Sequence, residues 1–264
     1  MFHTLYNVST MFLLLPFTKF IARFMEKIIP SLPESETKVY EKKLLYLDAQ
    51  MSQSPSVATH NAQMEIRRMG NIANENFALA IESFFEKNPA TLKTIRDNEK
   101  VIDYLNHKIT SRLAAISGMT LSAFEASNVS KMLVILSDIE RIGDHAVNIA
   151  AHTSTIITDG LKISPAAIKE ISKLAESVNK INENALNAYV NQDKTCLPQI
   201  KSASKKIDKK ITQCVDNHIE RLKSEECEPA AGVIFTAIIN DLQRCAHHAK
   251  NIAFSVALER KWNK

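Results

Sequence analysis

The chain has 264 residues, of which 45% are hydrophobic and 23% charged, and its formal net charge is +4. That length is enough for one or two domains with hydrophobic cores, and a small charge without a basic stripe gives no indication of nucleic-acid binding. With only five glycines and eight prolines, the chain has too few turn-forming residues for an all-β protein. Apolar residues recur at three- and four-residue spacing almost throughout, which predicts an all-α fold.

The N-terminal segment is the most apolar part of the chain. Residues 1–18 contain no Asp, Glu, Lys or Arg, and Lys19, Arg23 and Lys27 follow at four-residue steps. Such a run approaches the length that crosses a hydrocarbon core of about 30 Å. Basic residues after the run, rather than before it, argue against a signal peptide and fit the cytoplasmic flank of a membrane segment. We expect residues 1–29 to form a membrane segment, or alternatively a helix lying on a membrane surface or packed on the protein.

Residues 30–57 are expected to be a connector. Pro30, Pro33 and Pro55 interrupt this stretch, which predicts no continuous helix across it. Residues 42–51 are the exception, since they have the composition of a short strand or a helical turn.

From residue 58 onward the sequence predicts six helices. Ser122 is followed three residues later by Glu125, the capping-box pattern of a helix start. Ser164 followed by Pro165 is a second typical helix start. The predicted helices cover about 59–87, 90–118, 122–159, 164–191, 195–223 and 229–261.

An internal repeat relates the first three predicted helices to the last three. Three strings recur in the same order, which is typical of a duplication and predicts two tandem three-helix bundles, residues 58–160 and 161–264. The recurring strings are Asn74-Glu75-Asn76 with Asn182-Glu183-Asn184, Ile102-Asp103 with Ile207-Asp208, and a run over residues 138–150 with residues 241–253.

Two pairs of acidic residues in the first copy are candidate metal ligands. Glu140 and Asp144 are four residues apart on one predicted helix, as are Glu99 and Asp103 on the preceding one. Facing helices of a bundle can converge such side chains, and carboxylates suit hard cations such as Mg²⁺, Ca²⁺ or Mn²⁺ and also bind iron. Gly143 would let a helix or ligand approach closely between the second pair. The alternative is that these acids are a solvated helix face.

The second copy has lost this acidic pattern. Gln243 stands in place of Glu140 and His247 in place of Asp144, so we expect the second copy to be structural. No motif for nucleotide binding, zinc proteolysis or serine hydrolysis occurs, and we predict that the chain is not an enzyme. The four cysteines have no zinc-site spacing and are expected to be free thiols.

The run over residues 138–150 resembles the signature of the PhoU family, whose motif E/D-x-x-x-D occurs in each of two three-helix bundles. Glu140 and Asp144 fall on that motif, and Glu99 and Asp103 resemble its counterpart on the preceding helix. The resemblance covers roughly residues 58–260. It implies a regulatory protein with a divalent metal or an iron cluster on the first bundle, and the changes at Gln243 and His247 put the second cluster in doubt.

The N-terminus is similar to the last membrane segment of the bacterial sodium/phosphate cotransporter family. The similar residues are His3–Val8 and Leu13–Phe17, with Tyr46–Asp48 and Pro55–Ala58 in the connector. Members of that family carry a C-terminal cytoplasmic PhoU-like domain. The resemblance therefore implies a truncated or split member at the inner membrane, with most of the chain on the cytoplasmic side and without the transport core.

Three functional hypotheses follow. The first is a cytoplasmic regulatory module of a sodium-dependent phosphate transporter, whose partners are the membrane, a transporter core or phosphate-signalling proteins. The second is a component that completes a symporter with a separately encoded core. The third is a metal-free helical adaptor. Under the first hypothesis the chain should not transport phosphate unaided, and a homo-oligomer is compatible with all three.

Overall fold

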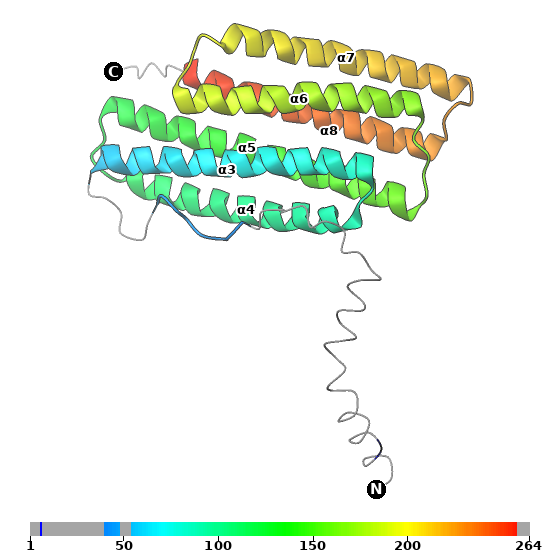
Figure 1. Ribbon diagram of the computed structural model, residues 1–264. Helices are drawn as coiled ribbons and strands as arrows, with labels where there is room; N and C mark the ends of the chain where they lie inside the picture. Colours follow the sequence, from blue (N-terminus) through cyan, green and yellow to red (C-terminus); the bar gives the residue numbers. More distant parts are fainter. Residues whose placement is uncertain (1–5, 7–39, 48–53, 258–264) are drawn as a thin grey trace. The chain divides into compact units, whose positions relative to one another are not determined.

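The computed structural model describes residue 6 and residues 40–47 and 54–257. The described helices belong to one compact unit, residues 39–264, and the described part of the chain contains no strand. The long helices run side by side (Figure 1). These are α3 (Pro55–Glu86), α4 (Pro89–Ser117), α5 (Ala123–Thr158), α6 (Pro165–Asn191), α7 (Leu197–Lys223) and α8 (Pro229–Phe254), followed by the 3₁₀ helix η2 (Ser255–Ala257).

The helix starts lie where local side-chain chemistry predicts them. Ser122 and Glu125 form the complete capping box at the start of α5, each side chain bonding to the other residue's backbone N–H. The Ser164 hydroxyl accepts a hydrogen bond from the Ala167 N–H at the start of α6. These contacts satisfy N–H groups that a helix terminus otherwise leaves without partners.

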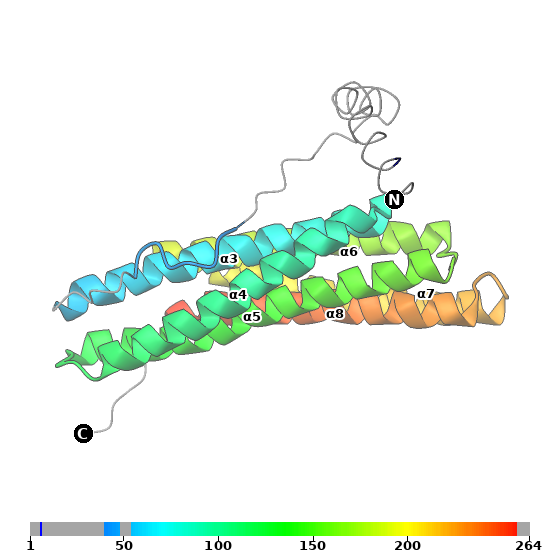
Figure 2. The same ribbon diagram turned by 90° about the horizontal axis from the view of Figure 1, so that it is seen from below.

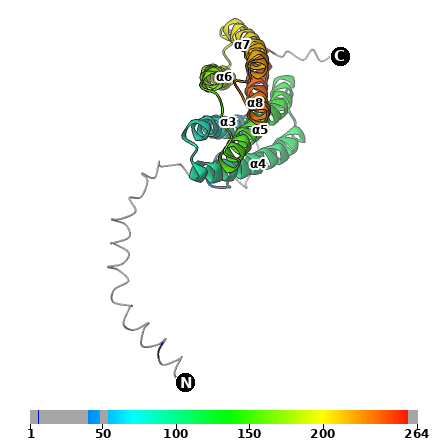
Figure 3. The same ribbon diagram turned by 90° about the vertical axis from the view of Figure 1, so that its right-hand side faces the viewer.

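The helices form two bundles that pack against each other. Helices α3, α4 and α5 contact one another in the first bundle, and α6, α7 and α8 do so in the second. The bundles meet through α5 with α8 and through α3 with α6, as the end-on view in Figure 3 shows. The predicted all-α fold with two tandem three-helix bundles is thus confirmed. The expected domain division at residue 160 falls in the connection between α5 and α6, and it stays a prediction.

Residues 40–47 of the expected connector are neither helix nor strand, so the short element expected within residues 42–51 is absent from residues 42–47. Residues 55–57, also expected to belong to the connector, form the start of α3. The N–H groups of Leu45 and Tyr46 both donate to Glu65 Oε2 on α3, at 2.8 Å each. Because these donors are used by a buried carboxylate, they do not form a helical or strand ladder. Figure 2 shows this segment, in blue, beside α3 and α4.

The predicted membrane segment, residues 1–29, lies outside the described residues except for Tyr6. Within the described residues, none of the helices combines the length and the apolar character needed to cross a bilayer.

Close packing between the bundles depends on a glycine. A Cβ atom on Gly70 of α3 would lie 2.6 Å from Leu186 Cδ1 on α6, which is closer than such atoms approach in practice. Glycine at this position therefore allows the α3 backbone to lie directly against the second bundle.

Two reciprocal sets of polar contacts join α5 to α8. His145 Nδ1 lies 2.8 Å from Asp241 Oδ1 on α8, and the Asn148 amide donates to the same oxygen at 3.4 Å. His152 Nε2 lies 3.3 Å from the other oxygen of Asp241. Burial alone would raise the pKa of Asp241, but hydrogen bonds with His145 and His152 outweigh burial and lower it.

The second set exchanges the roles of the two helices. His248 Nδ1 of α8 lies 2.8 Å from Asp138 Oδ1 of α5, and the Asn251 amide donates to that oxygen at 3.3 Å. The rings of His145 and His248 stack with centroids 5.7 Å apart. The recurring sequence run thus supplies the same Asp, His and Asn to each half of one interface.

We expect Asp241→Ala to lower the free energy of unfolding by about 1–3 kcal/mol, because it removes the carboxylate that pairs with two half-buried histidines of α5. Chemical denaturation measures this change, with Asp216→Ala on the exposed side of α7 as the control.

A carboxylate whose pKa is lowered in the folded state stabilises above its unfolded pKa and loses that contribution as the pH falls through its folded pKa. The difference between wild type and Asp241→Ala should therefore shrink below about pH 4. Equal effects of the two variants would contradict the assigned role.

Candidate metal centre

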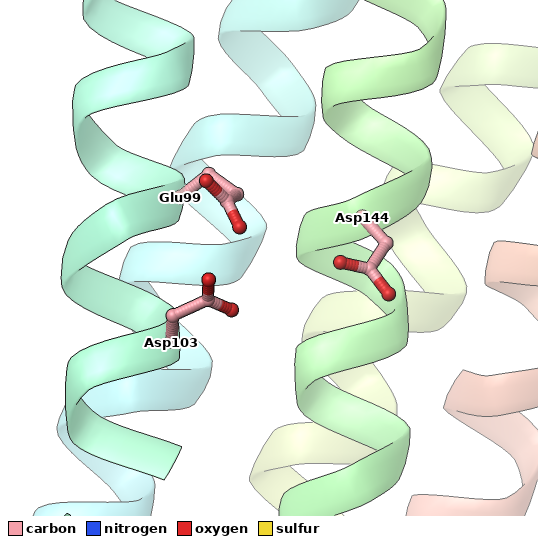
Figure 4. A group of neighbouring side chains, drawn as sticks. All are labelled: Glu99, Asp103 and Asp144. Carbon is pink, nitrogen blue, oxygen red and sulfur yellow. The ribbon is translucent and has the colours of Figure 1, made fainter. Parts of the chain in front are cut away.

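Three of the four predicted ligands come together in the first bundle. Glu99 and Asp103 lie one turn apart on α4, and Asp144 faces them from α5 (Figure 4). One carboxylate oxygen from each of the three lies within 4.8 Å of the other two. These three residues are called the acidic cluster below. The arrangement brings together side chains that are about forty residues apart in the chain.

A glycine sets the distance between the two helices at this point. A Cβ atom on Gly143 would lie 3.1 Å from Ile102 Cδ1, which is tighter than nearly all such contacts. Gly143 and Ile102 immediately precede Asp144 and Asp103, so the close contact places the two acids opposite each other. The approach that the sequence predicted at Gly143 is thus made by α4.

The fourth predicted ligand, Glu140, lies beside the acidic cluster rather than in it. It is one turn before Asp144 on α5, and it forms a hydrogen bond with Asn106 of α4. Burial is the main cause of its raised pKa, and the negative charges of Asp144 and Asp103 raise it further. Glu140 therefore experiences the field of the acidic cluster.

The acidic cluster carries more negative charge than its surroundings neutralise. Burial, a hydrogen bond with Asp103 and the charges of Asp103 and Asp144 raise the pKa of Glu99 to about 7. The nearest base to Asp144 is Arg141, whose Nη1 lies 3.7 Å from Oδ2 in an exposed pair. An exposed pair at that distance contributes little. The cluster therefore holds a proton or attracts another cation.

The donor set fits a hard divalent cation. All three groups offer oxygen, which Mg²⁺, Ca²⁺ and Mn²⁺ prefer, and carboxylates also serve iron. The other acids near these helices are engaged elsewhere, since Asp97 pairs with Lys100 at 2.8 Å and Glu75 accepts a hydrogen bond from the Tyr40 hydroxyl. A cation at this position would be held by Glu99, Asp103 and Asp144, and it would neutralise their mutual repulsion.

In the second bundle, the position equivalent to the acidic cluster is occupied by side chains that contact one another. Asp208 of α7 corresponds to Asp103, and its Oδ1 accepts a hydrogen bond from the Gln243 amide at 3.0 Å. His247 Nε2 lies 2.9 Å from the same oxygen. These partners offset the effect of burial and lower the pKa of Asp208. Gln243 and His247, the two residues that stand in place of Glu140 and Asp144, thus both contact Asp208.

The two adjacent histidines of α8 serve different contacts. His247 contacts Asp208 within the second bundle, and His248 contacts Asp138 in the first. His145, beside Asp144 in sequence, turns away from the acidic cluster toward Asp241. The inter-bundle role of these residues was not predicted, although the recurring run that contains them was recognised.

Comparison with known proteins supports the assignment of both bundles to one family. The PhoU domain model matches residues 66–153 and 171–256, one match in each bundle. The PhoU homolog 1 of Thermotoga maritima, a phosphate-specific transport system accessory protein, is 24% identical over 73% of this chain and 82% of its own length. YjbB of Salmonella typhimurium, whose name assigns it to inorganic phosphate export, is 21% identical over 97% of this chain. The chain spans 47% of the length of that relative.

Solved structures share the fold. PhoU from Pseudomonas aeruginosa superposes with a TM-score of 0.73 at 18% identity, over 77% of this chain and 97% of that one. The phosphate transport system regulatory protein PhoU from Streptococcus pneumoniae gives a TM-score of 0.70 at 17% identity.

We expect Glu99→Gln to stabilise the protein at pH 8.5 in the absence of divalent cations, because it removes one negative charge from the acidic cluster. A carboxyl group whose pKa is raised in the folded state stabilises fully below its unfolded pKa and loses that contribution as the pH rises through the folded value, here about 7. The wild type should therefore lose stability between pH 6 and pH 8.5 relative to the variant. Thermal unfolding in chelator-containing buffer measures this difference.

Asp97→Asn is the matched control, since it neutralises an exposed acid of the same helix that pairs with Lys100. That variant should not gain stability at pH 8.5. A Glu99→Gln protein with the wild-type pH dependence would show that Glu99 does not titrate near pH 7.

Proposed function

The chain belongs to the PhoU domain family, and we propose that it regulates phosphate transport together with a membrane transporter core or with phosphate-signalling proteins. The observation that carries this proposal is the match of the PhoU domain to both bundles. Relatives that are named as accessory proteins of the phosphate-specific transport system support the same assignment. The proposal gives the chain no catalytic role.

The finer proposal concerns the membrane context. The alignment with YjbB includes 97% of this chain, so it extends through most of the residues before α3, where the PhoU homologues do not align to the same extent. We propose that residues 1–29 are a membrane-associated segment at the inner membrane and that the two bundles lie on the cytoplasmic side, and the extended alignment is the support for the first part. Sodium dependence of the transporter, and a core encoded in another chain, remain part of this proposal and rest on the resemblance of the N-terminus.

Two other functions remain as alternatives. In the first, the chain completes a sodium/phosphate symporter, its N-terminal segment packing as the last helix of the core. In the second, the chain is a helical adaptor that binds no metal. The extended alignment with YjbB favours a transporter context over a free adaptor.

We also propose that the acidic cluster, with Glu140 beside it, binds a divalent cation or an iron cluster. The support is the convergence of three carboxylates at a glycine-mediated helix contact, together with the raised pKa of Glu99 that burial and the neighbouring acids cause. A bound cation would link α4 to α5 and would compete with the proton on Glu99. The cation thus stabilises the first bundle, the part of the protein in which the family motif is intact.

Addition of Mn²⁺ or Mg²⁺ to chelator-treated protein should raise the midpoint of thermal unfolding of the wild type. It should have little effect on Glu99→Gln/Asp103→Asn/Asp144→Asn, because the ligands that bind the cation are neutralised. Elemental analysis of the purified proteins provides a second readout. Asp97→Asn should behave as the wild type, and an equal metal content in wild type and triple variant would rule out this site.

Phosphate flux tests the regulatory role. Membrane vesicles containing this chain alone should show no sodium-dependent phosphate uptake, whereas co-production with a sodium/phosphate cotransporter core from which the PhoU-like domain has been deleted should change phosphate flux through that core. Deletion of residues 1–29 should shift the chain from the membrane to the soluble fraction and abolish this effect. Uptake by the chain alone would contradict the proposal that the transport core lies in another chain, and unchanged flux through the core would favour the adaptor.

A further inference from the structure

A small cleft between α7 and α8 in the second bundle has the chemistry of an anion site. Its volume is about 180 Å³, room for several water molecules at about 30 Å³ each. Helices α7 and α8 contact each other in the second bundle. We call it the α7–α8 cleft, and it is lined by Lys201, Ser204, Lys205, Asp208, Lys250 and Phe254.

The positive charge of the cleft comes from the way the second copy of the helix diverged. The segment 96–100 of α4 reads Arg-Asp-Asn-Glu-Lys, and the equivalent segment 201–205 of α7 reads Lys-Ser-Ala-Ser-Lys. Both basic positions are retained, while serines replace both acids. In the first bundle Lys100 is neutralised by Asp97. Its counterpart Lys205 forms no ion pair within the described part of the chain, and neither does Lys201.

The remaining acid does not cancel this charge. Asp208 Oδ1 already accepts hydrogen bonds from Gln243 and His247, at 3.0 and 2.9 Å. Lys250 also acts on this carboxylate electrostatically. Three lysines against one carboxylate leave the cleft with a net positive charge.

The Ser204 hydroxyl beside the cleft is a buried group without a hydrogen-bond partner in the described part of the chain. Ser204 is only 2% exposed, and its Oγ forms no hydrogen bond. Serine in a helix ordinarily bonds the carbonyl one turn back or faces water, and a buried polar atom without a partner is costly. Ser204 lines the same cleft as the three lysines, so an oxygen of a bound anion would supply the missing partner.

We propose that the α7–α8 cleft binds a phosphate-class oxyanion, held by Lys201, Lys205 and Lys250 with the Ser204 hydroxyl as an additional donor. Several donors around one small cleft suit a compact anion with several acceptor oxygens. The duplication thus produced an acidic position for a cation in the first bundle and a basic position for an anion in the second. This inference does not depend on the proposed metal site or on a transporter partner.

Isothermal titration of the full chain with inorganic phosphate at constant ionic strength tests the proposal. We expect binding to one site, weakened by roughly tenfold or more in Lys201→Gln/Lys250→Gln, because two charge-assisted hydrogen bonds are lost. Ser204→Ala should weaken it less. Lys209→Gln is the control, since it neutralises an exposed lysine of α7 that does not line the cleft.

A second arm identifies the source of the anion. Sedimentation with vesicles of phosphatidylcholine, with or without phosphatidic acid, compares the wild type with the double lysine variant. Binding of free phosphate that the double variant loses identifies a soluble anion as ligand. A loss confined to phosphatidic acid vesicles identifies a lipid headgroup. If the double variant and Lys209→Gln match the wild type in both arms, the proposal is wrong.

The acidic-cluster variant Glu99→Gln/Asp103→Asn/Asp144→Asn separates this proposal from the proposed function. It should bind phosphate as the wild type does, whether or not the first bundle binds a cation.

Discussion

The structure depends on two buried carboxylates that each need a partner from the other bundle. Asp138 and Asp241 lie in the α5–α8 interface, where an unpaired charge would cost several kcal/mol. Each of these carboxylates contacts a histidine and an asparagine of the opposite helix. Separation of α5 from α8 would therefore remove the partners of both carboxylates at once. Together with the contact at Gly70, this reciprocal arrangement explains why six helices built from two repeats form a single compact unit.

Helix α5 combines this structural role with the candidate site. Successive residues of a helix are about 100° apart, so Asp138 and His145 share one face, while Glu140 and Asp144 lie on another face about 130° around the helix. The first face contacts α8 and the second contacts α4. A cation that draws Asp144 toward Asp103 would therefore act on the helix that also carries the inter-bundle contacts. This gives a physical route by which the state of the acidic cluster can reach the second bundle.

The two copies show how a duplicated helix pair can keep its packing and change its chemistry. In the first bundle the charge between α4 and α5 is predominantly acidic, and Glu99 holds its proton near neutrality. In the second bundle Gln243 and His247 satisfy the single acid, and the retained lysines face a serine in place of Glu99. The polar residues of the inter-bundle contacts recur in both copies, whereas the acids of the acidic cluster have been replaced in the second copy except at Asp208. Charge between two helices of one bundle can change sign at little cost because apolar packing stabilises each bundle.

The sequence by itself determined the all-α class, the tandem repeat, the capped starts of α5 and α6, and three residues of the acidic cluster. These features follow from local chemistry and helical periodicity, which depend on neighbours within a few residues. Only the tertiary structure decided that Glu140 lies beside the cluster, that residues 42–47 form no regular element, and that His145 and His248 join the two bundles. Those outcomes depend on which helix faces which. The spacing of residues along the sequence determines which face of a helix each side chain occupies. Packing between segments about a hundred residues apart determines which residue that side chain contacts.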